Sequence, residues 1–198
     1  MTPLLFGMLF GLATAFPIGV QSFVVMNQGL RVGYPKVIVG IATASLCDIL
    51  LIVLGAAGAS ALLVTPGNER LLISIGVLFF LVIGVTTLCS SPEKETEVKS
   101  RTHVGAMIAQ TVGVSLLNPH AVFETVDLLG GAIAVQSAGD RLGFAAGVIS
   151  ASWAWFFAIG FGASTLRARL TPPVRLWTQR GSGALMLVFS AFLVLQLI

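Results

Sequence analysis

The sequence has very few charged residues. Only 10% of its 198 residues are Asp, Glu, Lys or Arg, whereas 56% are hydrophobic. Soluble domains carry about 25% charged residues, so this composition excludes an ordinary soluble protein. Charge is absent altogether from residues 71–92, 142–166 and 181–198. Because about 20 apolar residues cross the hydrocarbon core as a helix, these runs predict membrane-spanning helices.

Cysteine and histidine are scarce, and an N-terminal positive charge is missing. Cys47 and Cys89 lie in apolar stretches, where a small buried residue is a better interpretation than a disulfide or a metal pair. The sequence holds no cluster of soft metal ligands, and we expect neither a resident metal nor a cofactor. No Lys or Arg precedes the first apolar run, which continues past Pro17. That run predicts a spanning segment rather than a cleaved signal peptide.

Six apolar segments follow one another along the chain. They cover about 3–28, 37–64, 71–90, 104–134, 142–166 and 181–198. We expect an all-α polytopic membrane protein with one transmembrane domain: a first three-helix repeat (1–90), a polar cytoplasmic linker (91–103) and a second three-helix repeat (104–198). The last segment is short and has no charged anchor at its end, so its full crossing stays open.

The two halves repeat one order of motifs. Residues 17–21 (PIGVQ) and 117–120 (LNPH) each interrupt an apolar stretch, and similar hexamers follow at 29–34 and 139–144. Ser45 and Gly55 recur as Ser150 and Gly160 at the same offset. A duplicated unit with three spans inserts the second copy upside down, so the pattern predicts inverted repeats whose first helices, 1 and 4, are broken by proline.

The basic residues predict how the chain sits in the membrane. Two of them, Arg70 and Arg141, fall on one side. The other nine fall in alternate loops on the opposite side, which Lys and Arg mark as cytoplasmic. Both termini should therefore be periplasmic, in a bacterial inner membrane. These nine residues are Arg31, Lys36, Lys94, Lys99, Arg101, Arg167, Arg169, Arg175 and Arg180.

The two proline breaks are candidate parts of a binding site. Asn118 is a preferred N-cap and Pro119 suits the first helical position, so a half-helix should begin there inside the membrane. Pro17 with Gly19 could do the same in the first half. Helix N-termini attract anions, and a substrate carboxylate fits either one. A simple kink without a ligand is the alternative, and two matching breaks favour a site.

Asp48 lies near the middle of the second segment, far from either interface. A carboxylate at that depth is costly and is by default a functional candidate, although a structural hydrogen bond to the broken helix is the alternative. The repeat places Trp153 at the equivalent position. An acid from one half and an aromatic face from the other would form a cradle for a cation.

A second acidic group follows the second break. His120, Glu124 and Asp127 are spaced by four and three residues, which places them on one helical face. Glu124 is a further candidate for binding a cation or coupling a proton, together with Asp48, and His120 could relay protons or stay neutral and hydrogen-bonded. Asp127 could instead lie near water. Gln21 and Asn118 would add amide donors and acceptors.

At this level of detail the sequence resembles the LysE-type amino-acid exporters, in particular the lysine/arginine exporter branch. The resemblance implies an inner-membrane exporter of basic amino acids, driven by the membrane potential or a proton gradient. It runs in order through nearly the whole chain. The matching stretches are 17–22 (PIGVQS), 25–29 (VMNQG), Arg31, 48–52 (DILLI), 117–120 (LNPH), 124–125 (ET), 129–130 (LG) and 149–152 (ISAS).

The chain also departs from the pattern of that family. Val20 and Ser22 replace Pro and Asn in the first motif, which makes the first break less open and shortens or removes one polar contact. In the second motif Val122 replaces an aromatic residue, Glu124 replaces Asp, and Asp127 stands where an apolar residue is usual. The longer and additional acids could retune the pocket.

The expected function is therefore export of L-lysine or L-arginine by a secondary transporter, with no catalytic residues. The partners would be the amino acid and the lipid bilayer, with a homodimer as a plausible assembly. Another amino acid is an alternative substrate. So is a divalent metal, held by Asp48, His120, Glu124 and Asp127. An intramembrane metalloenzyme with His120 and Glu124 as ligands lacks the further groups of a catalytic set.

Overall fold

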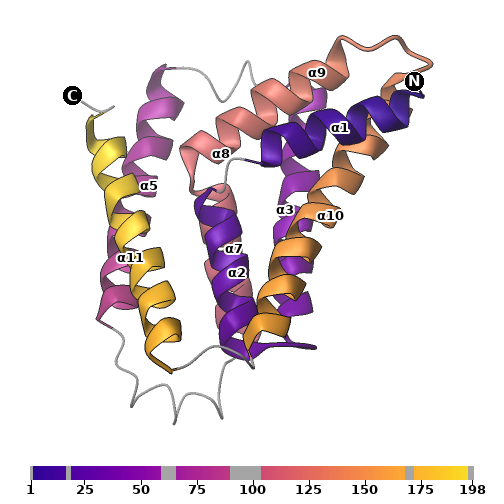
Figure 1. Ribbon diagram of the computed structural model, residues 1–198. Coiled ribbons are helices and arrows are strands. Elements are labelled where there is room, and N and C mark those ends of the chain that lie inside the picture. Colours follow the sequence, from indigo (N-terminus) through magenta and orange to yellow (C-terminus); the bar gives the residue numbers. More distant parts are fainter. Residues whose placement is uncertain (1, 17–18, 59–65, 90–103, 168–171, 196–198) are drawn as a thin grey trace.

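The computed structural model describes residues 2–16, 19–58, 66–89, 104–167 and 172–195, and every element in these ranges is a helix (Figure 1). The linker expected at 91–103 and Pro17 lie outside the described residues. In the first half the helices are α1 (Pro3–Ala15), α2 (Val20–Val32), α3 (Val37–Ala56) and α5 (Pro66–Leu88). In the second half they are α7 (Val104–Leu116), α8 (Pro119–Phe123), the π-helix η1 (Glu124–Leu129), α9 (Gly130–Ala134), α10 (Arg141–Leu166) and α11 (Pro172–Leu195).

Several of these helices are long and apolar enough to cross a membrane. Val37–Ala56, Arg70–Leu88 and Arg141–Leu166 each qualify alone, and α1 and α2 qualify only as a pair that is bent by 84° at the break, as a broken span or a re-entrant loop is. Val104–Leu116 and Arg180–Leu195 are shorter apolar helices. The chain is thus a multi-pass helical membrane protein, while the expected number of six spans and their repeat stay predictions.

Both expected helix breaks are present. α1 ends at Ala15 and α2 begins at Val20, and α7 ends at Leu116 just before Asn118 and Pro119. Proline lacks the N–H group that a continuous helix needs, so a new helix begins at Pro119 as its first residue. Each predicted segment at these places is therefore two helical pieces that meet at an angle.

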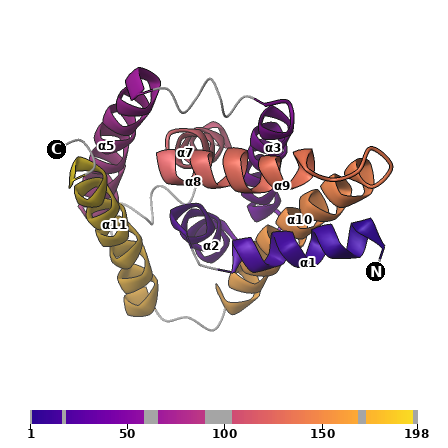
Figure 2. The ribbon, with the colours of Figure 1, turned by 90° about the horizontal axis from the view of Figure 1, so that it is seen from above.

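The pieces around the breaks occupy two levels of the bundle. In Figure 1, α1 and the run α8–η1–α9 lie across the upper end, whereas α2 and α7 stand upright below them. Seen from above, the two upper pieces lie over α3 and α10, and α5 pairs with α11 at one side (Figure 2). The breaks are thus brought together at one level, and α1 packs on α10 while α7 packs on α3.

Glycines hold the upper pieces tightly to the upright helices. Gly55, in the last turn of α3, faces Gly130 at the start of α9. A Cβ on Gly55 would overlap the Val126 carbonyl oxygen and lie 2.9 Å from the Gly130 Cα. Small residues allow this close approach of helix backbones. The contact fixes η1 and α9 against α3 and so fixes one wall of the site described next.

Candidate substrate-binding cavity

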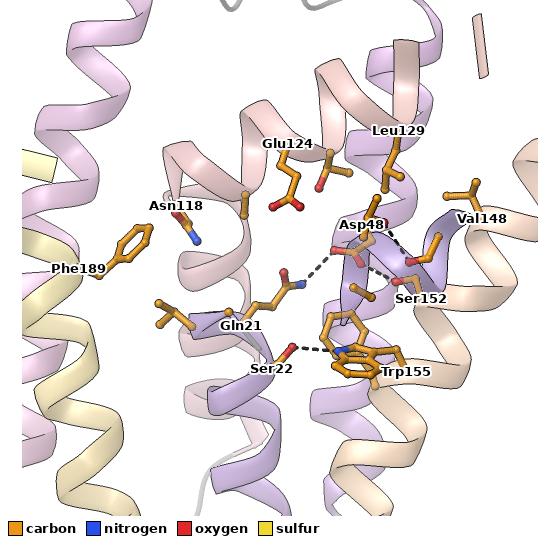
Figure 3. Close-up of a pocket in the computed structure, with 18 residues that line it drawn as sticks. Gln21, Ser22, Asp48, Asn118, Glu124, Leu129, Val148, Ser152, Trp155 and Phe189 are labelled. Carbon is orange, nitrogen blue, oxygen red and sulfur yellow. Dashed lines mark hydrogen bonds between the residues drawn. The ribbon is translucent and has the colours of Figure 1, made fainter. Parts of the chain in front are cut away.

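A cavity of about 310 Å³ lies where the two helix breaks meet. Its walls come from α1, the start of α2, the middle of α3, the run α8–η1, α10 and α11 (Figure 3). Residues from both halves of the chain therefore contribute to one space. The lining consists of Gly11, Thr14, Ala15, Gly19, Val20, Gln21, Ser22, Asp48, Asn118, Ala121, Glu124, Thr125, Leu129, Val148, Ser152, Trp155, Phe156 and Phe189.

Asp48 is the central polar group of this cavity. Its Oδ1 accepts a hydrogen bond of 3.0 Å from Gln21 Nε2, at the start of α2. Its Oδ2 accepts a second hydrogen bond from the Ser152 hydroxyl of α10 (Figure 3). One carboxylate thus ties α2, α3 and α10 together. Two donors on an ionised acid satisfy part of its hydrogen-bonding capacity and leave further lone pairs for a ligand.

A second hydrogen bond joins α2 to α10 beside Asp48. Trp155 Nε1 donates to the Ser22 hydroxyl over 3.0 Å, so the indole is fixed against the cavity wall. A buried Trp N–H usually finds such a partner, and the ring is then held in one orientation. The cavity therefore has an acid and an ordered aromatic side chain on adjacent walls.

Glu124 brings a second carboxylate into the same space. It is the first residue of the π-helix η1, and its side chain points into the cavity toward Asp48 (Figure 3). The two carboxylates therefore belong to the lining of one cavity. Single π-helical turns inside helices occur frequently at functional sites. No Lys or Arg is among the described residues that line the cavity, so its acids attract cations.

Asn118 lies at the break itself. It is 5% exposed, and its Oδ1 has no hydrogen-bond partner among the described residues. Its own carbonyl accepts from the Val122 N–H at 3.0 Å, which is the first bond of the new helical run. A buried polar atom without a partner is costly unless water or a ligand satisfies it. Asn118 is therefore placed to contact whatever enters the cavity.

Most of the predicted site residues meet in this cavity. Gly19, Gln21, Asp48, Asn118 and Glu124 all belong to its lining. Pro119 is buried, and its ring would contact a Cβ placed on Gly76 of α5, so it supports the break from outside the cavity. Pro17 and the His120 side chain lie outside what the structure describes.

Two predicted positions fall elsewhere and require correction. Trp153 is 38% exposed and is absent from the lining, whereas Ser152 and Trp155 face the cavity. Successive helical residues turn by about 100°, so residues 152 and 155 share a face and 153 does not. Asp127 does not share the face of Glu124, because the wider π-helical turn separates the two residues. It is exposed and outside the lining, which agrees with the alternative that it lies near water.

Some lining residues have no role in the expectations drawn from the sequence. Ser152 and Thr125 belong to stretches that match the family but have no assigned function, and Trp155 belongs to no motif. The signal for Trp155 is its spacing of three from Ser152, which becomes informative once Asp48 is known to face α10. Among the described residues, no group of three His, Cys, Asp or Glu side chains lies close enough together to hold a metal ion.

Fold and cavity together define a class. Broken helices around an internal acidic cavity in a multi-pass helical protein are typical of membrane transporters. The family model and the named relatives identify the chain as a transporter and not an enzyme. The chain belongs to the LysE type translocator family, whose model matches residues 12–197. No solved structure matches the chain.

Relatives of known name agree with that family. The arginine exporter protein ArgO of Klebsiella pneumoniae is 35% identical over 202 residues, covering 96% of this chain and 90% of its own length. The ArgO protein of Enterobacter sp. strain 638 is 36% identical over 169 residues, covering 83% of this chain and 79% of its own. The ArgO protein of Pectobacterium carotovorum is 35% identical over 176 residues, covering 84% and 83%.

Proposed function

We propose that the protein exports basic amino acids, L-lysine and L-arginine, across the bacterial inner membrane. The observation that carries this proposal is the pair of acids, Asp48 and Glu124, in one cavity without a described basic residue. A zwitterionic amino acid brings no net charge to such a site, whereas lysine and arginine bring one positive charge. The relatives that are named arginine exporters support the same substrate class.

The cavity offers separate places for the two ends of the substrate. The side-chain cation would lie near Asp48 and Glu124, with the Trp155 indole beside it. The carboxylate would lie at the helix breaks, near Gly19 at the start of α2 and Asn118 before α8. Backbone N–H groups at a helix start have no partner within the helix and favour an anion.

Transport would proceed by alternating access, with the cavity exposed first to the cytoplasm and then outward. Asp48 and Glu124 are also the groups that could couple a proton, with His120 as a relay. The basic residues at the lower end of α2, α3 and α10 favour a cytoplasmic location for that end, and hence periplasmic termini.

Efflux from reconstituted proteoliposomes tests this proposal. Vesicles are loaded with labelled arginine, lysine, leucine or, in a separate set, Mn²⁺, and release is compared with empty-membrane controls. The proposal expects release of arginine and lysine, with leucine and Mn²⁺ retained. Release of leucine at the rate of arginine would exclude charge selection, and release of Mn²⁺ alone would favour the divalent-metal alternative.

A further inference from the structure

Below the cavity, a line of polar side chains continues along the contact between α2, α7 and α3. On α7, Thr111 and Ser115 are four residues apart and share one helical face, and Asn118 follows at the break after this helix. On α2, Gln21 and Gln28 are seven residues apart and also share a face. Asn118 and Gln21 are at the cavity, and the other three lie deeper, toward the C-terminal end of α2.

Gln28 closes this polar line. Its Nε2 donates to Thr111 Oγ1 at 3.0 Å and to the Met107 carbonyl at 3.3 Å, which joins α2 to α7. Gln28 is 5% exposed and Thr111 is 0% exposed, so the junction is sealed from solvent. It lies seven residues from Gln21, roughly 10 Å along the helix from the cavity.

Helix α3 packs closely against the Gln28 side chain. Gly40 of α3 faces Gln28, and a Cβ at this position would overlap Gln28 Oε1. That oxygen is buried and has no hydrogen-bond partner among the described residues. Asn118 Oδ1, at the cavity end of the line, is also buried and has no hydrogen-bond partner among the described residues. Buried oxygens without partners are costly in apolar surroundings, unless water or a passing ligand satisfies them at another stage.

We propose that the contact between α2, α7 and α3 is the closed half of the translocation route, and that Gln28 is its gate residue. The proposal rests on the transport function proposed above. Opening requires the two hydrogen bonds of Gln28 to break. The released amide, with Thr111 and Ser115, then offers oxygens to the ammonium groups of the substrate and to the water that accompanies it. The route leads toward the end of the bundle where Arg167 Nη1 donates to the Val32 carbonyl.

The native residue Cys47 can report the opening of the contact between α2, α7 and α3. Cys47 of α3 is 7% exposed and lies beside Ser115, in the proposed route and outside the cavity lining. Labelling of Cys47 by N-ethylmaleimide is measured in a Cys89→Ser variant, reconstituted in proteoliposomes, with and without arginine. The matched control is Ser182→Cys in a variant lacking both native cysteines, because Ser182 is 1% exposed on α11 and also lacks a partner among the described residues.

We expect arginine to accelerate labelling of Cys47 by about tenfold. Labelling follows the population of the open state, and one or two hydrogen bonds hold the closed state by about this factor. Labelling of the Ser182→Cys control should not change. Gln28→Met and Gly40→Ala weaken the gate by independent means, so both should label at the accelerated rate without arginine. Gly113→Ala, which crowds Phe79 on the other face of α7, should behave as the parent.

Unchanged Cys47 labelling upon arginine addition, in vesicles shown to export arginine, overturns the gate while leaving the proposed function intact. Parent-like labelling in both Gln28→Met and Gly40→Ala, at normal membrane abundance, overturns the role of Gln28. Vesicles that export no arginine at all contradict the proposed function instead, so the two failures are distinguishable. If Gly40→Ala does not fold, Gln28→Met alone decides.

Discussion

Replacing Asp48 by asparagine removes one charge from the cavity and little else. Gln21 and Ser152 donate to the two carboxylate oxygens in the parent protein. In Asp48→Asn the amide oxygen can face Ser152 and accept from its hydroxyl, and the Gln21 amide can rotate so that its oxygen accepts from the new NH₂ group. The structural cost is therefore about the net value of one hydrogen bond, roughly 1 kcal/mol. An asparagine also inserts into the membrane at least as easily as a carboxylate.

The functional cost is larger. A cation about 4 Å from Asp48 gains roughly 4 kcal/mol at an effective dielectric constant of about 20. Its loss corresponds to a decrease in affinity of up to about a thousandfold. We expect normal membrane abundance with arginine and lysine efflux largely lost, measured as initial rates from proteoliposomes. Asp127→Asn is the matched control, because Asp127 is exposed and outside the cavity lining. Efflux by Asp48→Asn within about twofold of the parent would refute the reasoning and transfer the cation site to Glu124.

Three further predictions concern the cavity wall, the helix packing and the topology. Trp155→Phe should reduce arginine affinity several-fold in a binding assay, while Trp153→Phe leaves it unchanged; equal effects would contradict the assignment of the aromatic wall. Gly55→Ala should lower the free energy of unfolding by about 1–3 kcal/mol in detergent, because its Cβ overlaps the backbone of η1. Gly131→Ala, which has open space, serves as its control, and a parent-like melting temperature for both would refute the close contact. A cysteine introduced in the 91–103 linker, in a variant without native cysteines, should resist impermeant maleimide in intact cells; labelling from outside would reverse the topology.

The helix breaks and most of the cavity can be predicted from the sequence. A proline next to an N-cap residue in an apolar run has few interpretations, so the residue types alone place Asn118 at a break. Asp48 can be recognised as a functional candidate equally well, because an acid in a membrane helix is costly and is usually retained for function. These two signals are local, and local signals can be read directly from the sequence.

The positions that the sequence misplaces depend on rotation about a helix axis. The repeat aligns Asp48 with Trp153, but the hydrogen bond goes to Ser152, one residue away, and the aromatic wall is Trp155. Asp127 falls on the face of Glu124 only if the spacing is α-helical. The π-helical turn at η1 changes that spacing, and the residue types in the segment do not predict a π-helix.

The central claim is that the cavity selects the positive charge of a basic amino acid. Equilibrium binding of labelled arginine to the purified protein tests it most directly, with unlabelled arginine and citrulline as competitors, since citrulline has a similar shape and an uncharged side chain. We predict that citrulline competes at least about a hundredfold more weakly than arginine. This factor is the loss of affinity expected when the charge interaction in a partly solvated site is removed. Competition by citrulline at the same concentration as arginine would contradict the account.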